Sequence, residues 1–275
     1  MKVGYKLRLP GGVGEREIAT TRASTSYWYH TFEFDSGHVI PGMYNIGVDI
    51  SDYRFPILSG KRVLDVGPAS GWFSAYFEQE GAEVTAVEAP SAEHFDEFGN
   101  WRRPVGNKIS MMRLDWAESF ETGGPMGPAF GLIRNLLGLN SRFVTATPYD
   151  IDSALKADEP YDIVFAGCLL MHLRDPVGAL LAMRRVCRGI IIANSYYDDK
   201  LDAVREPVMN FTGWSPILWW LPNKQCLIKW FEGAGFGDVK AESYVTLRAD
   251  TPYIDRHGRS YGKTQKLRLV HAHVT

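Results

Sequence analysis

From Lys61 onward, short apolar runs alternate with amphipathic segments in the order strand, turn, helix. Strands are predicted over 61–66, 83–89, 141–147, 161–167, 190–194, 239–247 and 266–274, where apolar and β-branched residues end at glycine or polar positions. Helices are predicted over 71–82, 129–138, 175–189 and 223–234. This alternation predicts an α/β fold, with a Rossmann-like, doubly wound, seven-stranded and mostly parallel sheet covered by helices on both faces.

The segment 175–189 carries the strongest helix pattern. Asp175 suits the N-cap, Pro176 suits the first turn, and Gly189 is expected to end the helix. The face expected to be buried consists of Val177, Leu180, Leu181 and Cys187. Asn223 is the predicted N-cap of the helix over 223–234, with Leu227, Ile228 and Phe231 facing inward.

Residues 1–60 differ from the rest, because short aromatic and glycine-rich pieces alternate there without a strong helical period. They predict an N-terminal extension or cap on the main domain of residues 61–275. A long insertion is expected over about 99–140, which includes the glycine- and proline-rich stretch 122–131.

Composition narrows the class of protein. Hydrophobic residues make up 45% and charged residues 23%, and the formal net charge is -2. No global basic field exists, so nucleic acid is not an expected partner. No apolar stretch reaches the ~20 residues of a spanning helix, and the first residues lack the apolar run of a signal peptide. A cytoplasmic protein is expected, with free thiols at its three separated cysteines, no metal site, and homo-oligomerisation left open.

Candidate chemistry begins in VLDVGPASGWF, residues 63–73. A strand leads into a turn with Gly67 and Gly71, whose lack of a side chain lets the backbone approach a ligand. The helix that follows points free N–H groups at the same place. Glu88 ends the next strand, where a carboxylate can accept hydrogen bonds from two ribose hydroxyls.

Asp65 distinguishes between possible cofactors. A carboxylate two residues before the first glycine would repel a pyrophosphate and attract the ammonium group of an amino acid. The middle glycine of G-x-G-x-x-G is also absent. A cofactor with a cationic amino-acid end therefore fits better than NAD, and an NAD dehydrogenase is the more distant alternative.

The string DVGPASG resembles motif I of class I S-adenosylmethionine (SAM)-dependent methyltransferases, with Ala69 in place of the middle glycine. The stretches 28–42, 161–180 and 219–236 are similar to a bacterial group related to the tRNA wobble-uridine carboxymethyltransferases. This resemblance implies SAM as cofactor and S-adenosylhomocysteine as product.

The resemblance also implies cofactor-binding residues. Asp65, Gly67 and Gly71, with the backbone of Pro68 and Ala69, would surround the methionyl part of SAM, and Glu88 would hold the ribose. The remaining contacts would be Ala89 beside the adenine, Tyr149 and Asp150 at the adenine edge, and Gly167, Cys168 and Leu169 near the sulfonium.

Two positions depart from the carboxymethyltransferases. Those enzymes use a carboxylated SAM, and the resemblance implies an arginine where this chain has Leu267 and a lysine where it has Tyr29. Arg268 is adjacent but is expected to face the other way on its strand. A carboxylated cofactor would lack its cationic partners, which favours ordinary SAM and plain methyl transfer.

Methyl transfer is an in-line displacement in which the protein aligns the acceptor and removes a proton from a hydroxyl. His172 is the first candidate base and His30 the second, and for each the alternative is a structural histidine. Tyr29, Trp214 and Trp219 are candidate acceptor-binding residues, whose alternative is core packing.

Three functions follow from these patterns. The first is methyl transfer to a small molecule or glycan, most readily at a hydroxyl oxygen. The second is modification of tRNA by a methyltransferase or carboxymethyltransferase. The third is SAM binding without catalysis, which the motif does not exclude.

Overall fold

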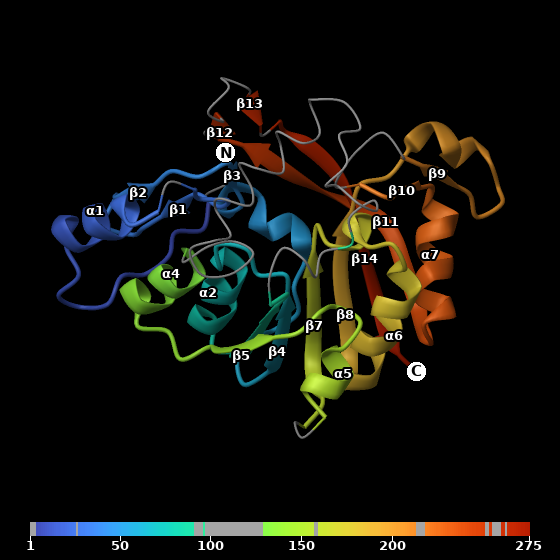
Figure 1. Cartoon of the computed structure of the whole chain (residues 1–275), viewed down its shortest axis with the longest axis horizontal. Coiled ribbons are helices and arrows are strands. Elements are labelled where there is room, and N and C mark those ends of the chain that lie inside the picture. Colours follow the sequence, from blue (N-terminus) through green and yellow to red (C-terminus); the bar gives the residue numbers. More distant parts are fainter. Residues whose placement is uncertain are drawn as a thin grey trace.

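The computed structural model describes residues 4–25, 27–90, 96, 129–156, 159–212, 218–250, 253–254, 260–261 and 263–275. Its centre is an eight-stranded sheet of order β3-β11-β14-β8-β7-β4-β5-β6 (Figure 1). Its strands are β3 (Tyr44–Asn45), β4 (Arg62–Val66), β5 (Glu83–Glu88), β6 (Arg142–Thr145), β7 (Tyr161–Gly167), β8 (Cys187–Ser195), β11 (Phe236–Ala249) and β14 (Gln265–Val274). The pairs among β4 to β8 are parallel, whereas β14 is antiparallel to both of its neighbours.

Smaller elements complete the described chain. The helices are α1 (Glu15–Ala23), α2 (Trp72–Gln79), α4 (Ala129–Leu137), α5 (Ile151–Ala154), α6 (Pro176–Val186) and α7 (Lys224–Gly233), with 3₁₀ helices η1 (Gly47–Tyr53), η3 (Leu170–His172) and η4 (Asp199–Ala203). Three antiparallel pairs join β1 (Phe32–Glu33) to β2 (Val39–Ile40), β9 (Met209–Phe211) to β10 (Trp220–Pro222), and β12 (Tyr253–Ile254) to β13 (Ser260–Tyr261).

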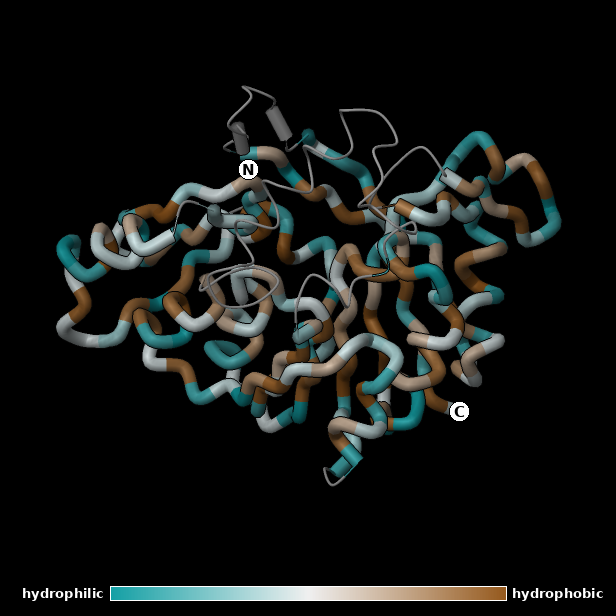
Figure 2. Tube along the Cα trace, viewed as in Figure 1, coloured by the Kyte–Doolittle hydropathy of each residue, from teal (hydrophilic) through white to brown (hydrophobic). Residues whose placement is uncertain are grey.

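Alternation along the central strands produces two cores. Val63 packs in the core on one face of the sheet, and its neighbour Leu64 packs in the core on the other. Helices α1, α2 and α4 lie on one side, and α5, α6 and α7 lie on the other (Figure 1). The hydrophobic colour in Figure 2 accordingly runs along the central strands. The sheet is doubly wound and mostly parallel, as the sequence predicts.

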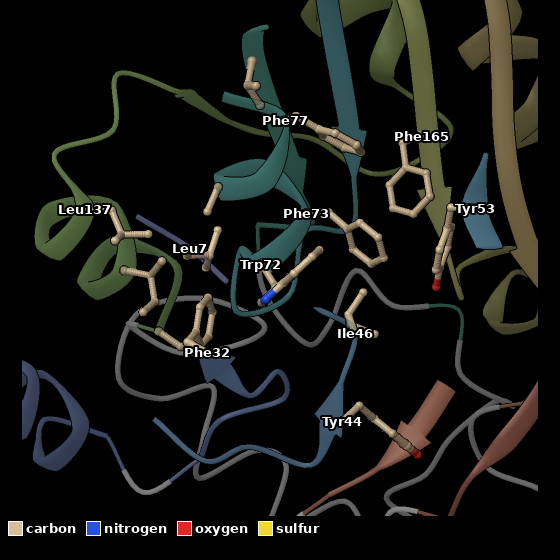
Figure 3. Close-up of a cluster of buried hydrophobic side chains, with 14 of the residues drawn as sticks. Leu7, Phe32, Tyr44, Ile46, Tyr53, Trp72, Phe73, Phe77, Leu137 and Phe165 are labelled. Carbon is tan, nitrogen blue, oxygen red and sulfur yellow. The ribbon is translucent and has the colours of Figure 1, made fainter. Parts of the chain in front are cut away.

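The N-terminal extension shares the core on the α2 side. Trp72 of α2 is 1% exposed and lies edge-on to Tyr5, with ring centroids 6.2 Å apart. Figure 3 shows Leu7 and Phe32 of the extension close to Trp72, with Phe73 directed towards Phe165 and Tyr53. The extension is thus fixed to the helix that follows the glycine loop.

The helix prediction for 175–189 is partly wrong. Asp175 is the N-cap, as predicted, and accepts a hydrogen bond of 2.8 Å from the Gly178 N–H. However, α6 ends at Val186, and Cys187 begins β8 by pairing with Tyr161 of β7. Gly189 therefore lies within β8 and does not end the helix. A side chain there would clash with the neighbouring strand β7, because a Cβ would lie 2.3 Å from the Asp162 carbonyl oxygen.

The inward faces also need correction. Leu181, predicted to be buried, is 38% exposed, and the buried side of α6 is formed by Ala179, Leu180, Ala182, Met183 and Val186. In α7, Asn223 is the N-cap and Leu227 and Phe231 are fully buried, as predicted, whereas Ile228 is half-buried.

None of the elements within residues 1–60 was predicted, namely α1, β1, β2, β3 and η1. Helix α1 has a single buried residue, Ile18, so it lacks the apolar period by which a helix is found in a sequence. Strand β3 pairs over only two residues with β11 and adds an eighth strand to the predicted seven. Most of the predicted insertion lies outside the described residues, although α4 forms where a helix was predicted over 129–138.

The described helices give no membrane span, because none combines sufficient length with sufficient apolar character.

Candidate functional site

The glycine loop joins β4 to α2 in an unusual backbone conformation. Gly67, Ala69 and Gly71 have φ angles of 74°, 52° and 87°, all in the left-handed region. The Gly67 N–H donates to the Val87 carbonyl at 2.9 Å, which ties the loop to β5. A Cβ on Gly71 would lie 2.8 Å from the Phe130 ring, so this position requires glycine for space as well as for conformation.

Asp65 lies beneath this loop. It is 1% exposed, and its carboxylate accepts a hydrogen bond of 2.6 Å from the Ser74 hydroxyl of α2. Burial raises the pKa of Asp65 to about 7, and the hydrogen bonds from Ser74 oppose this rise. Among the described residues, Asp65 has a hydroxyl partner and no ion pair.

Glu88 connects the end of β5 to the same loop. It is 9% exposed, and its Oε1 accepts a hydrogen bond of 3.0 Å from the Ala89 N–H. Burial raises the pKa of Glu88 to about 7, against hydrogen bonds from the Ala89 and Ala69 amides, and the charge of Asp65 adds to the rise. The structure therefore brings both predicted carboxylates to the glycine loop, where each is costly to ionise without a ligand.

The chain after β7 reaches the glycine loop from the neighbouring strand. Leu169 Cδ1 lies 3.6 Å from the position that a Cβ on Gly67 would occupy, so Leu169 borders the loop directly. Cys168 is half-buried with a φ of 52°. His172 ends η3, is half-buried, and donates its backbone N–H to the Leu169 carbonyl at 2.9 Å. The loop of Gly167, Cys168 and Leu169 thus lies beside the glycine loop, whose residues are predicted to bind the cofactor.

Tyr149 and Asp150 follow β6 and are already engaged within the protein. The Tyr149 hydroxyl donates to the Asp96 carboxylate and accepts a hydrogen bond of 3.2 Å from the Asp175 N–H. Asp150 is exposed, and its carboxylate accepts a hydrogen bond of 2.6 Å from the Thr147 hydroxyl. Their contact with adenine stays a prediction.

Asp96 is a residue that sequence analysis did not identify as functional. Its carboxylate accepts the Arg174 N–H at 2.8 Å, and its backbone carbonyl accepts the indole N–H of Trp219 at 2.7 Å. Asp96 therefore joins Tyr149, the β7 loop and Trp219. Trp219 is held in place by this bond, whereas Trp214 lies outside the described residues.

The extension contributes Tyr29 and His30 to this edge of the sheet. The Tyr29 N–H donates to the Ser70 hydroxyl of the glycine loop at 2.9 Å. His30 is 4% exposed, its Nδ1 has no partner among the described residues, and its ring lies 6.0 Å from that of Phe73. Burial lowers the pKa of His30 to about 3, so its imidazole is neutral at physiological pH.

A group of tyrosines surrounds Cys168, and sequence reasoning found only Tyr29 among them. Burial raises the pKa values of Tyr29, Tyr44, Tyr53 and Tyr196, and Cys168 adds to the rise for each. The Tyr196 hydroxyl hydrogen-bonds to that of Tyr44. Burial also raises the pKa of the Cys168 thiol to about 12. These groups are protonated and uncharged at neutral pH.

Together, the fold and these loops define a doubly wound α/β protein with a candidate ligand site at the carboxyl ends of β4, β5 and β7. A family described as a methyltransferase domain matches residues 48–241. The chain belongs to this family and is a class I SAM-dependent methyltransferase.

Curated relatives are consistent with this assignment. A tRNA U34 carboxymethyltransferase of Dichelobacter nodosus is 28% identical over 196 residues, which are 68% of this chain and 51% of that protein. The corresponding protein of Chromohalobacter salexigens is 23% identical over 186 residues, covering 66% of this chain and 46% of the relative. The chain thus spans about half the length of these relatives.

The N-terminal domain of EvdMO1, solved with S-adenosylhomocysteine bound, matches with a TM-score of 0.55 at 16% identity. The match covers 97% of this chain and 100% of that domain. At this identity the likeness shows a shared fold.

Proposed function

We propose that the glycine loop holds SAM and that the chain transfers the methyl group to a hydroxyl oxygen of a small-molecule or glycan acceptor. The observation that carries the proposal is the pair of buried carboxylates, Asp65 and Glu88, beside the glycine loop. The bound cofactor would supply a sulfonium methyl group as electrophile.

The residues present fit this cofactor chemically. An ammonium group near Asp65 would give that carboxylate the cationic partner that it lacks among the described residues. Ribose hydroxyls would donate to Glu88, which has free acceptor capacity beside the Ala89 amide. Both interactions favour the ionised acids and so offset the cost of burying them.

Ordinary SAM fits better than a carboxylated form. Leu267 is fully buried in the apolar core on the α2 side. The Arg268 guanidinium lies on the opposite face, donates to the Ala241 carbonyl at 2.9 Å, and stacks 4.6 Å from the centre of the Tyr197 ring. Arg268 is therefore engaged away from the glycine loop, as the alternation predicts, and Tyr29 contributes no charge.

The acceptor side supports an uncharged hydroxyl substrate. Tyr29, Tyr44 and Tyr196 present protonated phenols around Cys168. His172 is the proposed base, since it lies on the loop that borders Gly67. The low pKa of His30 makes it a weak base, so we assign it the role of a neutral structural residue of the cap.

Modification of tRNA is the second candidate, because the relatives at 28% and 23% identity are tRNA U34 carboxymethyltransferases. The net charge of -2 gives this chain little general attraction to a polyanion. This candidate predicts salt-dependent tRNA binding and transfer of label to bulk tRNA.

Calorimetry and thermal unfolding with SAM, S-adenosylhomocysteine and NAD test the cofactor. We expect stabilisation by the first two and none by NAD. Stabilisation by NAD alone would overturn the proposal. An acceptor screen with methyl-labelled SAM then compares hydroxylated small molecules and glycans with bulk tRNA, and SAM binding with no transfer to any acceptor would favour the non-catalytic alternative.

A further inference from the structure

Asn194 is a buried amide at the carboxyl end of β8, and it contacts the β7 loop. It is 1% exposed and lies opposite Gly167 in the parallel ladder between β7 and β8. Its Oδ1 accepts a hydrogen bond of 2.5 Å from the Cys168 N–H. Its Nδ2 donates to the Tyr53 hydroxyl at 3.0 Å. Both ends of the amide are therefore used, each by a different segment of the chain.

The Cys168 end of this amide holds an unfavourable backbone conformation. A φ of 52° is disfavoured for a residue with a Cβ, and such conformations persist where the surroundings fix them. Immediately after this residue, Leu169 lies against Gly67 of the glycine loop. The left-handed turn at Cys168 thus sets how the β7 loop meets the donor site.

The Tyr53 end connects the same turn to the N-terminal extension. Tyr53 ends η1, is 1% exposed, and stacks on Phe55 with ring centroids 5.5 Å apart. Its ring also lies 5.1 Å from that of Phe73 in the first turn of α2. This packing fixes the Tyr53 hydroxyl, and the hydroxyl in turn fixes the orientation of the Asn194 amide.

We infer that Asn194 is a positioning residue for the donor site. Through the Cys168 amide it maintains the left-handed turn that places Leu169 against the glycine loop, and through Tyr53 it makes this turn dependent on the extension. The inference rests on the proposed function, because it assumes that the cofactor binds beside Gly67. Asparagine suits the role because one side chain supplies an acceptor for a backbone N–H and a donor for a phenol.

A double-mutant cycle between Asn194→Leu and Cys168→Gly tests this role. The probe is S-adenosylhomocysteine, titrated by calorimetry into the full-length chain. Leucine has a similar size and removes both hydrogen bonds, so we expect the dissociation constant to rise about tenfold or more. In the Cys168→Gly background the same change should raise it less than about threefold, because glycine adopts the left-handed turn without support.

Tyr53→Phe removes only the hydroxyl group and should produce a smaller loss of affinity, of about threefold, since the bond between Asn194 and Cys168 is retained. Asn45→Leu provides a control, because Asn45 is another buried asparagine, 8% exposed, whose amide donates to Glu33 outside this network. Its effect on S-adenosylhomocysteine affinity should be the same in both Cys168 backgrounds.

An equal loss of affinity in both backgrounds would show that Asn194 acts through packing alone, and the inference would be wrong. If the unmutated chain binds no S-adenosylhomocysteine, the proposed function fails first. Should Asn194→Leu not fold, Asn194→Ala completes the same cycle, because it removes the amide without introducing an apolar branch.

Discussion

The proposed donor side, which would hold the cofactor, and the proposed acceptor side of this site are constructed differently. The donor side comes from β4, the glycine loop and β5, which are consecutive in the chain and include Asp65 and Glu88. The acceptor side combines Tyr29 and Tyr44 of the extension with Cys168 after β7 and Tyr196 after β8. A local motif identifies the first from sequence, whereas the second exists only after distant segments have packed together.

The two sides also differ in charge. Burial raises the pKa values of Asp65 and Glu88 to about 7, so a cationic ligand can change their ionisation. Burial raises the pKa values of the tyrosine hydroxyls around Cys168 well above neutral pH, so these groups stay uncharged. In the proposed function, the donor side would therefore select a cation by charge, while the acceptor side would select through shape and hydrogen bonds.

The largest expected effect separates catalysis from cofactor binding. If His172 is the base, His172→Ala should lower turnover by about 100-fold or more, the usual contribution of general base catalysis. Affinity for S-adenosylhomocysteine should change less than about twofold, because the proposed role concerns the acceptor. Turnover is measured as S-adenosylhomocysteine released with an acceptor from the labelled-SAM screen.

His30→Gln is the matched comparison, since a neutral amide replaces a neutral imidazole without introducing a charge. It should retain most of the activity. Full turnover in His172→Ala would make His172 structural, and loss of turnover only in His30→Gln would place the base in the extension instead.

The same contrast explains what the sequence could predict. The seven main strands could be predicted because apolar alternation is a local signal, and the motif at 65–71 is likewise local, so the proximity of Asp65 and Glu88 to the glycine loop could be predicted as well. Strand β3, Tyr44, Tyr196 and Asn194 were missed, because their roles depend on which segments meet at the sheet edge. Cys187 was misassigned for a related reason, since pairing with Tyr161 overrode the helical pattern before it.

The second prediction concerns the donor carboxylates. Asp65→Asn and Glu88→Gln should each weaken S-adenosylhomocysteine binding by about 10- to 100-fold, the scale of a lost hydrogen bond to a charged group. Glu83→Gln is the control, because Glu83 begins the same strand as Glu88 and its side chain is 72% exposed. Calorimetry gives the three affinities.

Stability provides a second measurement on the same variants. Without ligand, Asp65→Asn should unfold at the same temperature as the unmutated chain or higher at pH 8, because it removes a buried charge while leaving an acceptor for Ser74. Unchanged affinity in both donor variants would show that the cofactor binds elsewhere.

The third prediction is a pH dependence. Since the folded-state pKa values of Asp65 and Glu88 lie above those of the unfolded chain, their contribution to stability is present at low pH and is lost as pH rises through about 7. Between pH 5 and 8, the unmutated ligand-free chain should lose stability relative to Glu88→Gln. Chemical denaturation across this range measures the difference.

Ligand binding should show the opposite trend. Below pH 7, the affinity for a ligand that requires an ionised carboxylate should rise about tenfold with each unit of increasing pH, for each proton released on binding. Above pH 7 the affinity should be constant. Affinity that does not vary with pH would mean that neither acid releases a proton on binding. The proposed difference in charge between the donor side and the acceptor side would then be wrong.

The smallest expected effect concerns Ala69, the position where methyltransferase motif I usually has glycine. Its φ of 52° costs a residue with a Cβ about 1–2 kcal/mol, and glycine at this position would avoid that cost. The greater freedom of glycine stabilises the unfolded chain by about 0.4–1 kcal/mol and so offsets part of this gain. Ala69→Gly should therefore raise the free energy of unfolding by about 0.5–1 kcal/mol, measured by denaturation in urea. Ala75→Gly in α2 is the control and should lower it by about 1–2 kcal/mol, because a helix disfavours glycine and the methyl group that is lost is fully buried. If both substitutions destabilise equally, the loop is not strained at Ala69, and the donor side would be as dependent on distant packing as the acceptor side.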